Sequence, residues 1–156
     1  MQDVGIVMTE QTLPQTRRQI WMGLLARAKP ARLAALFPEL PPHEVLRAPE
    51  VGAVMVQGRI GGTGQPFNLG EMTVTRCALR LDADIVGHAH VQGRDKDHAR
   101  RAAVLDGLMQ GDQAALIQAQ VLDVLQVEQA QRRRARAAKA AATKVEFFTL
   151  VRGEDQ

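Results

Sequence analysis

The N-terminal part of the chain carries apolar residues at the spacing of an amphipathic helix. They are Ile20, Trp21, Leu24, Leu25 and Ala28. We therefore expect a helix from Thr16, ended by Pro30, which can itself open a second helix over residues 31–37. Residues 1–13 show no clear period and are predicted to be a flexible N-terminal extension, which leaves residues 14–156 as a single domain.

The middle of the chain alternates apolar and polar residues with the period of two that is typical of strands. The predicted strands cover residues 44–47, 51–59, 72–81 and 85–92. Ala48-Pro49-Glu50 separates the first two strands as a hairpin-like break. Because the connections are too short for parallel crossovers, we expect the last three of these strands to form one antiparallel sheet.

The last third of the chain is predicted to be helical. Its first buried stripe consists of Ala102, Leu105 and Met109. Gly111 ends this helix, and Asp112 can cap the next, which covers residues 113–127 and can extend to residue 142. Residues 145–151 form a further β-rich run. This order predicts an α+β fold with helical N-terminal and C-terminal segments, in which helices pack mainly on one face of an antiparallel sheet.

Composition places the protein among ordinary globular chains. Hydrophobic residues make up 46% and charged residues 24% of the sequence, and the net charge is only +3. No apolar run approaches the roughly 18 residues that span a bilayer, and no secretory signal is visible, so we expect a cytoplasmic protein without membrane association. The single cysteine, Cys77, excludes an internal disulfide and is expected to be a buried structural thiol.

One candidate site is the turn between two predicted strands, where three of four consecutive residues are glycine. Its members are Arg59, Gly61, Gly62, Thr63 and Gly64. Glycines let backbone N–H groups approach a ligand, and the guanidinium of Arg59 can pair with phosphate or carboxylate. No Gly-Lys-Ser/Thr follows and no helix opens after the turn, which excludes a P-loop and a dinucleotide fingerprint. Anion binding and a long flexible strand connection remain the two interpretations.

A second candidate is the corner that joins the last strand of the meander to the following helix. It contains Gln92, Gly93, Arg94, Asp95 and His98. Gly93 can adopt a positive φ at the join, and Asp95 lies where a carboxylate satisfies the free N–H groups of a helix start. This chemistry alone favours an ordinary strand-to-helix connection, and the companion glycine turn strengthens the functional interpretation.

Two further clusters are weaker candidates. His88 and His90 share one face of a predicted strand near His98, but no acidic ligand joins them, and no metal site is expected. A stretch without acidic residues, 129–145, contains Arg132, Arg133, Arg134, Arg136, Lys139 and Lys144. Because aromatic residues do not alternate with these charges, we expect a solvated face or a docking surface for an acidic partner subunit, and not a nucleic-acid interface.

Four segments, taken together, resemble the PhnG family, which is the small subunit of the bacterial carbon–phosphorus lyase system for phosphonate use. In chain order they are Arg59-x-Gly61-Gly62-Thr63-Gly64, Thr75-Arg76, Val91-Gln92-Gly93-Arg94-Asp95-Lys96-x-His98-Ala99 and Phe147-Phe148-Thr149-x-Val151-Arg152-Gly153. The resemblance runs from about residue 18 to residue 153. The first dozen residues and the arginine-rich tract depart from the family pattern.

The resemblance implies a non-autonomous subunit of a transferase complex that also contains the PhnH, PhnI and PhnJ subunits. The complex replaces the adenine of ATP by a phosphonate and gives ribose 1-phosphonate 5-triphosphate, so MgATP and an alkylphosphonate are substrates of the complex. No cofactor is expected on this chain, because the radical iron–sulfur chemistry belongs to PhnJ, and one cysteine cannot supply the four thiolates that a cluster ordinarily needs. The alternative is a stand-alone nucleotide- or nucleic-acid-binding module that uses the basic C-terminal helix.

No residue is assigned a catalytic role from the sequence. The candidates for substrate or partner contact are Arg59, Gly61, Gly62, Thr63, Gly64, Arg76, Gln92, Gly93, Arg94, Asp95 and His98. Displacing a base from ribose requires a stabilised anomeric carbon, help for the leaving purine and a placed phosphonate. The sequence shows no convincing paired carboxylates or base-activating triad, so the chain alone is expected not to release adenine from ATP.

Overall fold

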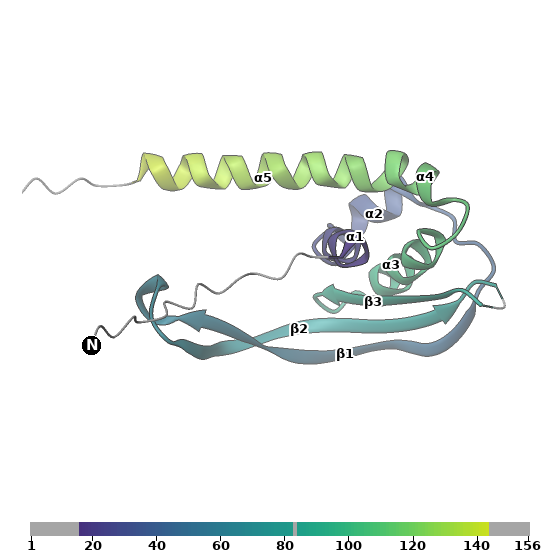
Figure 1. Cartoon of the computed structure of the whole chain (residues 1–156), viewed down its shortest axis with the longest axis horizontal. Helices are drawn as coiled ribbons and strands as arrows, with labels where there is room; N and C mark the ends of the chain where they lie inside the picture. The colour runs from purple at the N-terminus through teal and green to yellow at the C-terminus, as the bar shows by residue number, and fades with distance from the viewer. Residues whose placement is uncertain (1–15, 83, 144–156) are drawn as a thin grey trace, which may run out of the picture.

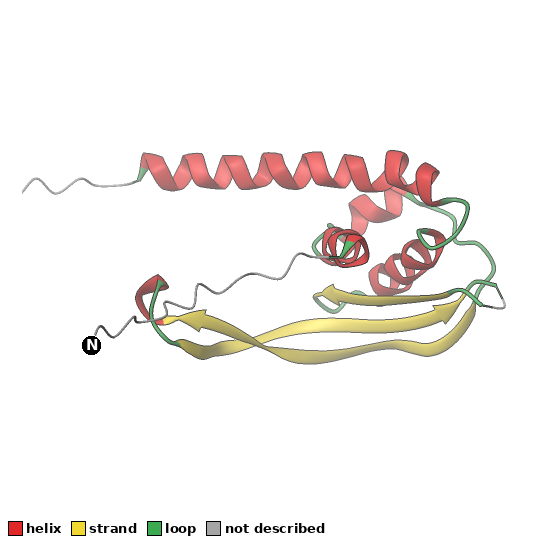
Figure 2. Ribbon diagram, in the orientation of Figure 1, coloured by secondary structure: helices red, strands yellow, loops and turns green. Residues whose placement is uncertain are grey.

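The computed structural model describes residues 16–82 and 84–143, so the predicted N-terminal extension and the β-rich run over 145–151 lie outside the described residues. In the described part of the chain, three strands form one antiparallel sheet, and helices cover one of its faces (Figure 1). Helices both precede and follow the strands (Figure 2). The predicted α+β fold is confirmed.

Two short helices open the described chain. α1 (Arg17–Ala26) begins after Thr16, whose hydroxyl oxygen accepts a hydrogen bond from the backbone N–H of Gln19, while the Gln19 side chain accepts one from the backbone N–H of Thr16. α2 (Pro30–Leu36) starts with proline at its first position, where the missing N–H costs no hydrogen bond. Both helices agree with the sequence prediction.

β1 (Glu44–Arg59) is one long strand and not the two strands that the sequence predicted. The predicted break over 48–50 is wrong, because a shift in the pairing register between Arg47 and Glu50 accommodates Pro49 without ending the strand. Proline is tolerated here because β1 lies at the edge of the described sheet, where one side of its backbone pairs with no other described strand.

β2 (Pro66–Arg80) is the central strand, and it pairs antiparallel with β1 on one side and with β3 (Val86–Gln92) on the other. The antiparallel arrangement agrees with the prediction. β2 starts earlier than predicted, at Pro66 and not at residue 72, because its first residues pair with the distal part of β1. The pairing of β3 with β2 ends where Gln92 lies opposite Val74.

The remaining helices follow the sheet. α3 (Lys96–Leu108) leads to the single turn of α4 (Ala114–Ile117), and a π-helical turn over residues 118–122 joins α4 to α5 (Asp123–Ala142). The predicted cap at Asp112 is wrong, because Gln113 is the N-cap of α4 and the carbonyl oxygen of Gly111 already accepts the N–H of Ala114 (3.2 Å). None of the described helices combines the length and the apolar character needed to cross a membrane.

In the described chain, the core lies between the sheet and the helices that cover it. The side chains of Leu79 in β2, Leu105 in α3 and Leu125 in α5 are buried in this core. α3 lies close to β3. This close approach requires Gly87 on β3, because a Cβ at this position would lie 1.9 Å from the carbonyl oxygen of Ala103. The backbone of α3 therefore packs directly on the edge strand.

A buried carboxylate connects α1, α3 and β3. Asp106 is fully buried, and its oxygens accept hydrogen bonds from Arg18 (Nε 3.1 Å and Nη2 2.6 Å), from the indole N–H of Trp21 (2.8 Å) and from the backbone N–H of His88 (2.9 Å). The hydrogen bond to Asp106 raises the pKa of the Arg18 guanidinium, which therefore stays charged. Sequence reasoning treated Trp21 as an ordinary core residue and missed this network.

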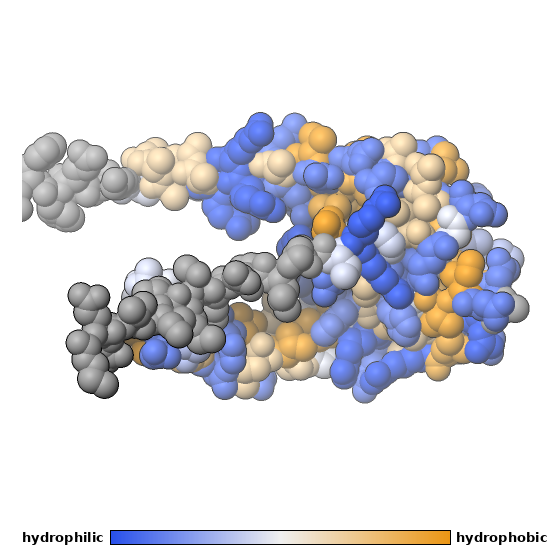
Figure 3. Space-filling model, in the orientation of Figure 1, coloured by the Kyte–Doolittle hydropathy of each residue, from blue (hydrophilic) through white to orange (hydrophobic). Residues whose placement is uncertain are grey.

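Two segments project from this compact part, which we call the body. The distal ribbon (residues 53–73) is the part of the β1–β2 hairpin that continues beyond the last β3 pairing, and the α5 arm (residues 131–142) is the exposed end of α5. Both project in the same direction along the long axis of the molecule (Figure 1). Hydrophilic side chains gather over the middle of α5 (Figure 3).

Candidate functional site

The predicted strand-to-helix corner is fixed to the central strand by two hydrogen bonds. Gly93 has φ of 94°, its N–H donates to the carbonyl oxygen of Thr73 (2.9 Å), and its own carbonyl oxygen accepts from the hydroxyl of Thr75 (2.7 Å). A left-handed conformation of this kind favours glycine. Two separated motifs of the sequence, around Thr75 and around Gly93, therefore meet in one rigid corner.

The residues of this corner have different surroundings. Gln92 and Arg94 are exposed, whereas Asp95 is the N-cap of α3 and its Oδ1 accepts the backbone N–H of His98 (2.8 Å). The His98 ring is buried and its Nε2 donates to the carbonyl oxygen of Leu25 (2.8 Å). Burial lowers the pKa of this histidine and outweighs the hydrogen bond to Leu25, which acts in the opposite direction. Of this group, Gln92 and Arg94 face the outside, while Asp95 and His98 hold the corner together.

The glycine turn lies at the tip of the distal ribbon. Gly61 and Gly62 have positive φ values of 61° and 85°, the N–H of Gly64 donates to the Ile60 carbonyl oxygen (2.8 Å), and Arg59 Nη1 donates to the Gly64 carbonyl oxygen (3.2 Å). The neighbouring Thr63 is exposed. The guanidinium of Arg59 thus closes its own turn.

The structure does not bring the glycine turn and the strand-to-helix corner together. Gln92 lies opposite Val74, and Arg59 lies opposite Pro66. The eight steps from Val74 to Pro66 along β2 correspond to roughly 26 Å at about 3.3 Å per residue. The two predicted turns are therefore separate places on the molecule.

Arg76 lies on the sheet face opposite the helices, because it alternates with Cys77 and with other residues that point into the core. Its guanidinium passes over Gly52, where a Cβ would lie 3.4 Å from Nη2. The pKa of the nearby Glu50 carboxyl is lowered, first by the hydrogen bond from Arg47 and also by the charge of Arg76. Arg76 therefore belongs to the outer face of the sheet.

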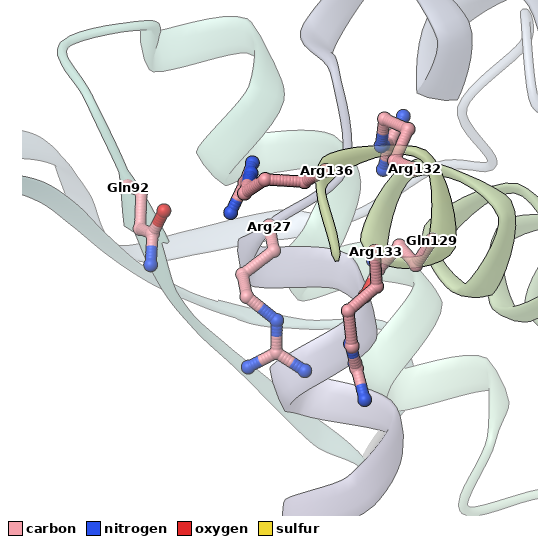
Figure 4. A pocket seen from close by; sticks show the side chains of 6 residues that line it. All are labelled: Arg27, Gln92, Gln129, Arg132, Arg133 and Arg136. Carbon is pink, nitrogen blue, oxygen red and sulfur yellow. The ribbon is translucent and has the colours of Figure 1, made fainter. Parts of the chain in front are cut away.

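A cavity at the root of the two projecting segments was not predicted. It has a volume of about 380 Å³. Its lining residues are Arg27, Gln92, Gln129, Arg132, Arg133 and Arg136 (Figure 4). They come from the end of α1, the end of β3 and the middle of α5, so the arginine-rich tract and the predicted corner share one place. We call this place the arginine cavity.

Hydrogen bonds and an ion pair hold α5 against the other elements of the cavity. The side chain of Gln129 is buried and its Nε2 donates to the carbonyl oxygen of Leu24 in α1 (2.9 Å). Arg32 of α2 pairs with Glu128 of α5 at 2.7 Å. These contacts fix the rotation of α5 about its axis, and this rotation decides which arginines face α1.

The histidines of β3 do not form a metal centre with other described residues. His88 and His90 are exposed side chains on the outer face of the sheet, whereas His98 lies buried on the helix side. Within residues 16–82 and 84–143, no group of three or more His, Cys, Asp and Glu side chains is placed to hold a metal ion.

The fold and the site define a class of protein: it is a small α+β protein with a cationic recess. Helices cover one face of its three-stranded sheet, and an arginine-lined cavity lies at the root of the two projecting segments. The model of the family described as "Phosphonate metabolism protein PhnG" matches residues 16–153. The chain belongs to the PhnG family, which confirms the resemblance carried by its motifs.

The chain is also similar to a protein of Rhizobium meliloti (strain 1021). That protein is described as alpha-D-ribose 1-methylphosphonate 5-triphosphate synthase subunit PhnG. The two sequences are 45% identical over 146 residues, which cover 89% of this chain and 91% of the relative. The similarity therefore extends over nearly the full length of both proteins.

Proposed function

We propose that the chain is a non-autonomous subunit of a complex that transfers the ribose triphosphate moiety of ATP to a phosphonate. Adenine leaves and α-D-ribose 1-phosphonate 5-triphosphate forms. Membership of the PhnG family and the name of the Rhizobium relative support this function. We infer that the other subunits are PhnH, PhnI and PhnJ and that the substrates of the complex are MgATP and an alkylphosphonate. We also infer that the complex is located in the cytoplasm, where ATP is available.

The observation that carries the role of a subunit is the distal ribbon. It is a two-stranded hairpin that β3 does not accompany, and a ribbon of only two strands is marginally stable in water. Its apolar side chains are nevertheless exposed, with Met55 at 54%, Ile60 at 63% and Leu69 at 66%. Large apolar groups that stay exposed on a projecting segment mark a surface for a partner.

A β-bulge contributes to this exposure. The register moves from Val56 opposite Gly70 to Gln57 opposite Asn68, so Leu69 is an extra residue without a partner on β1. A bulge of this kind redirects a side chain at the edge of a sheet. Leu69 is the most exposed large hydrophobic residue in the described chain, and the bulge accounts for its outward position.

The edges of the distal ribbon provide a second means of attachment. Among the strands of residues 16–82 and 84–143, β1 is an edge strand along its whole length, and β2 has no neighbour other than β1 between Pro66 and Met72. Unpaired strand edges are templates to which another chain can add a strand. Apolar side chains would then add contact area to the backbone hydrogen bonds of a partner subunit.

The division of chemistry between subunits follows from what the reaction requires. Displacement of adenine needs charge stabilisation at the anomeric carbon, a proton for the leaving purine and a placed phosphonate. The arginine cavity supplies groups that hold anions, and its lining contains guanidinium and amide groups. We infer that partner subunits supply the groups that act on the ribose and the purine.

The test of this function combines capture and turnover. We expect the chain, co-expressed with PhnH, PhnI and PhnJ, to purify with them, and the double variant Met55→Lys/Leu69→Lys to lose at least roughly 90% of the captured partners, because a charge buried in an apolar interface is costly. Leu116→Lys is the matched control, since Leu116 is also exposed (51%) but lies on α4. This control should capture partners like the native chain.

The second measurement follows adenine and the ribose phosphonate product by chromatography and phosphorus NMR. The purified chain with MgATP and methylphosphonate should give neither product, and the assembled complex should give both. Turnover by the chain alone, at a rate that the partners do not change, would contradict the proposal. So would undiminished capture by the Met55→Lys/Leu69→Lys variant.

A further inference from the structure

The arginine cavity concentrates positive charge that the described chain does not neutralise. Arg27, Arg132, Arg133 and Arg136 all line it, and no carboxylate of the described residues does. None of these four arginines forms an ion pair within the described residues. Like charges gathered in one recess repel each other, so this arrangement costs stability unless an anion joins it.

The cavity is a built feature and not a chance meeting of mobile side chains. Gln129 forms part of its wall and is held by its bond to the Leu24 carbonyl oxygen, and Gln92 is held by the rigid corner at the end of β3. Figure 4 shows Arg136 reaching from α5 toward Gln92, while the guanidinium groups of Arg27 and Arg133 point to the same side. α1 and α5 therefore supply the guanidinium groups that line the cavity, and β3 adds the amide of Gln92.

We propose that the arginine cavity binds the polyphosphate chain of a triphosphate ester. One phosphate or phosphonate group carries at most about two negative charges at neutral pH, so four guanidinium groups exceed what a single group requires and suit a chain of phosphates. Arginine also matches phosphate oxygens with two parallel hydrogen bonds. The volume of about 380 Å³ lies in the range of small-molecule sites.

A neighbouring cavity can hold the sugar and its substituent, the part of the ester that carries no phosphate. It has a volume of about 290 Å³, shares Arg27, Gln129 and Arg133 with the arginine cavity, and adds Ile20 and Gln126 from α1 and α5. A sugar with its substituent can lie there while its phosphates lie among the arginines. The inference that the ligand contains a polyphosphate follows from the charges of the arginines alone. The narrower inference that this ligand is a ribose triphosphate rests on the proposed function.

The test is calorimetric titration of the purified full chain with sodium tripolyphosphate, ATP and methylphosphonate in separate arms. We expect tripolyphosphate and ATP to bind and methylphosphonate to bind at least roughly tenfold more weakly. Arg27→Ala and Arg133→Ala should each weaken tripolyphosphate binding by roughly tenfold or more, because each removes a charge-assisted hydrogen bond. Arg133→Lys should recover only part of the affinity, since lysine lacks the planar fork.

Arg134→Ala is the matched control, because Arg134 is an exposed arginine next to Arg133 that does not line the cavity. It should change the affinity by less than roughly twofold. All five lining and control arginines sit at exposed or half-buried positions, and circular dichroism of each variant verifies that it folds. A stronger affinity for ATP than for tripolyphosphate would support occupation of the neighbouring cavity by the nucleoside part.

Several results would overturn the assignment. They are no binding of tripolyphosphate at millimolar concentration, equal affinity for methylphosphonate, or equal losses in Arg133→Ala and Arg134→Ala. Loss of partner capture by Arg133→Ala without any tripolyphosphate binding would assign the cavity to an acidic segment of a partner and would also overturn it. Tripolyphosphate binding without partner capture would leave this inference standing and contradict the proposed function instead.

Discussion

The body and the two projecting segments differ in how far their polar and apolar side chains are buried and bonded. In the body, both oxygens of the buried Asp106 carboxylate accept hydrogen bonds, and the ring of His98 is buried with its Nε2 bonded. On the distal ribbon and along α5, Leu69 is largely exposed and Arg133 has no ion pair among the described residues. The buried groups of the body stabilise the fold, whereas the exposed groups of the projections are available to other molecules. Stability and binding should therefore respond to different substitutions.

The largest predicted effect is that of Asp106→Ala on the stability of the body. This substitution should remove about 3–5 kcal/mol from the free energy of unfolding. Arg18 can turn its half-exposed guanidinium to water, but the N–H groups of Trp21 and His88 would lose their acceptor inside the protein, at about 1–3 kcal/mol each. Urea unfolding followed by far-ultraviolet circular dichroism measures the loss. The affinity of the folded fraction for tripolyphosphate should not change.

Asp112→Ala is the control for this substitution. Asp112 is an exposed carboxylate that does not cap α4, so its removal should change the free energy of unfolding by less than about 0.5 kcal/mol. Equal losses in Asp106→Ala and Asp112→Ala would show that the buried network does not hold the body together.

The next effect depends on pH and should be confined to the body. Burial lowers the pKa of His98 below that of the unfolded chain, about 6.5, so the unfolded state binds the proton first as the pH falls. The contribution of the neutral ring is complete above pH 6.5 and is lost progressively below it. Urea midpoints of the native chain should therefore fall between pH 7.5 and pH 5.5.

His98→Gln isolates this effect, because the glutamine amide can still donate to the Leu25 carbonyl oxygen but does not titrate. The variant should show a clearly smaller fall over the same pH range. An equal slope in the variant and the native chain would assign the pH dependence to other groups.

The smallest predicted effect separates stability from binding within one substitution. A Cβ at Gly23 in α1 would lie 3.3 Å from Arg27 Nη1, so Gly23→Ala should displace this guanidinium slightly while it favours the helix. We expect a gain of about 0.5–1 kcal/mol in the free energy of unfolding and a weaker affinity for tripolyphosphate, by less than Arg27→Ala causes. In an Arg27→Ala background the same change should leave the affinity unaltered.

The local rules of the sequence predicted much of the body. Asp95 caps α3 as expected, α1 begins next to Thr16, Pro30 opens α2, and the alternation over 72–81 matches the buried and exposed faces of β2. These features depend on neighbours a few residues away, which is why spacing alone identifies them. The break expected at residues 48–50 failed because pairing with β2 over the full length of β1 outweighs the preference of one proline.

The arginine cavity could not be predicted in this way. Arg27 and the arginines of α5 are about a hundred residues apart, and charges spread around a helix do not reveal which of them will face another helix. That choice is made by the contact of Gln129 with α1 and by the ion pair of Arg32 with Glu128. The corner at Gly93 was easier to find, because a glycine between a strand and a helix cap is itself a local signal.

The bond between Trp21 and Asp106 gives the protein an internal optical probe. Trp21 is the sole tryptophan of the chain, and its indole N–H donates to a buried carboxylate. Its emission wavelength and intensity therefore report on the contact between α1 and α3, and Asp106→Ala should shift the emission in the folded protein. A partner that covers only the distal ribbon should leave this fluorescence unchanged, so assembly through the ribbon is spectroscopically silent while loosening of the body is visible.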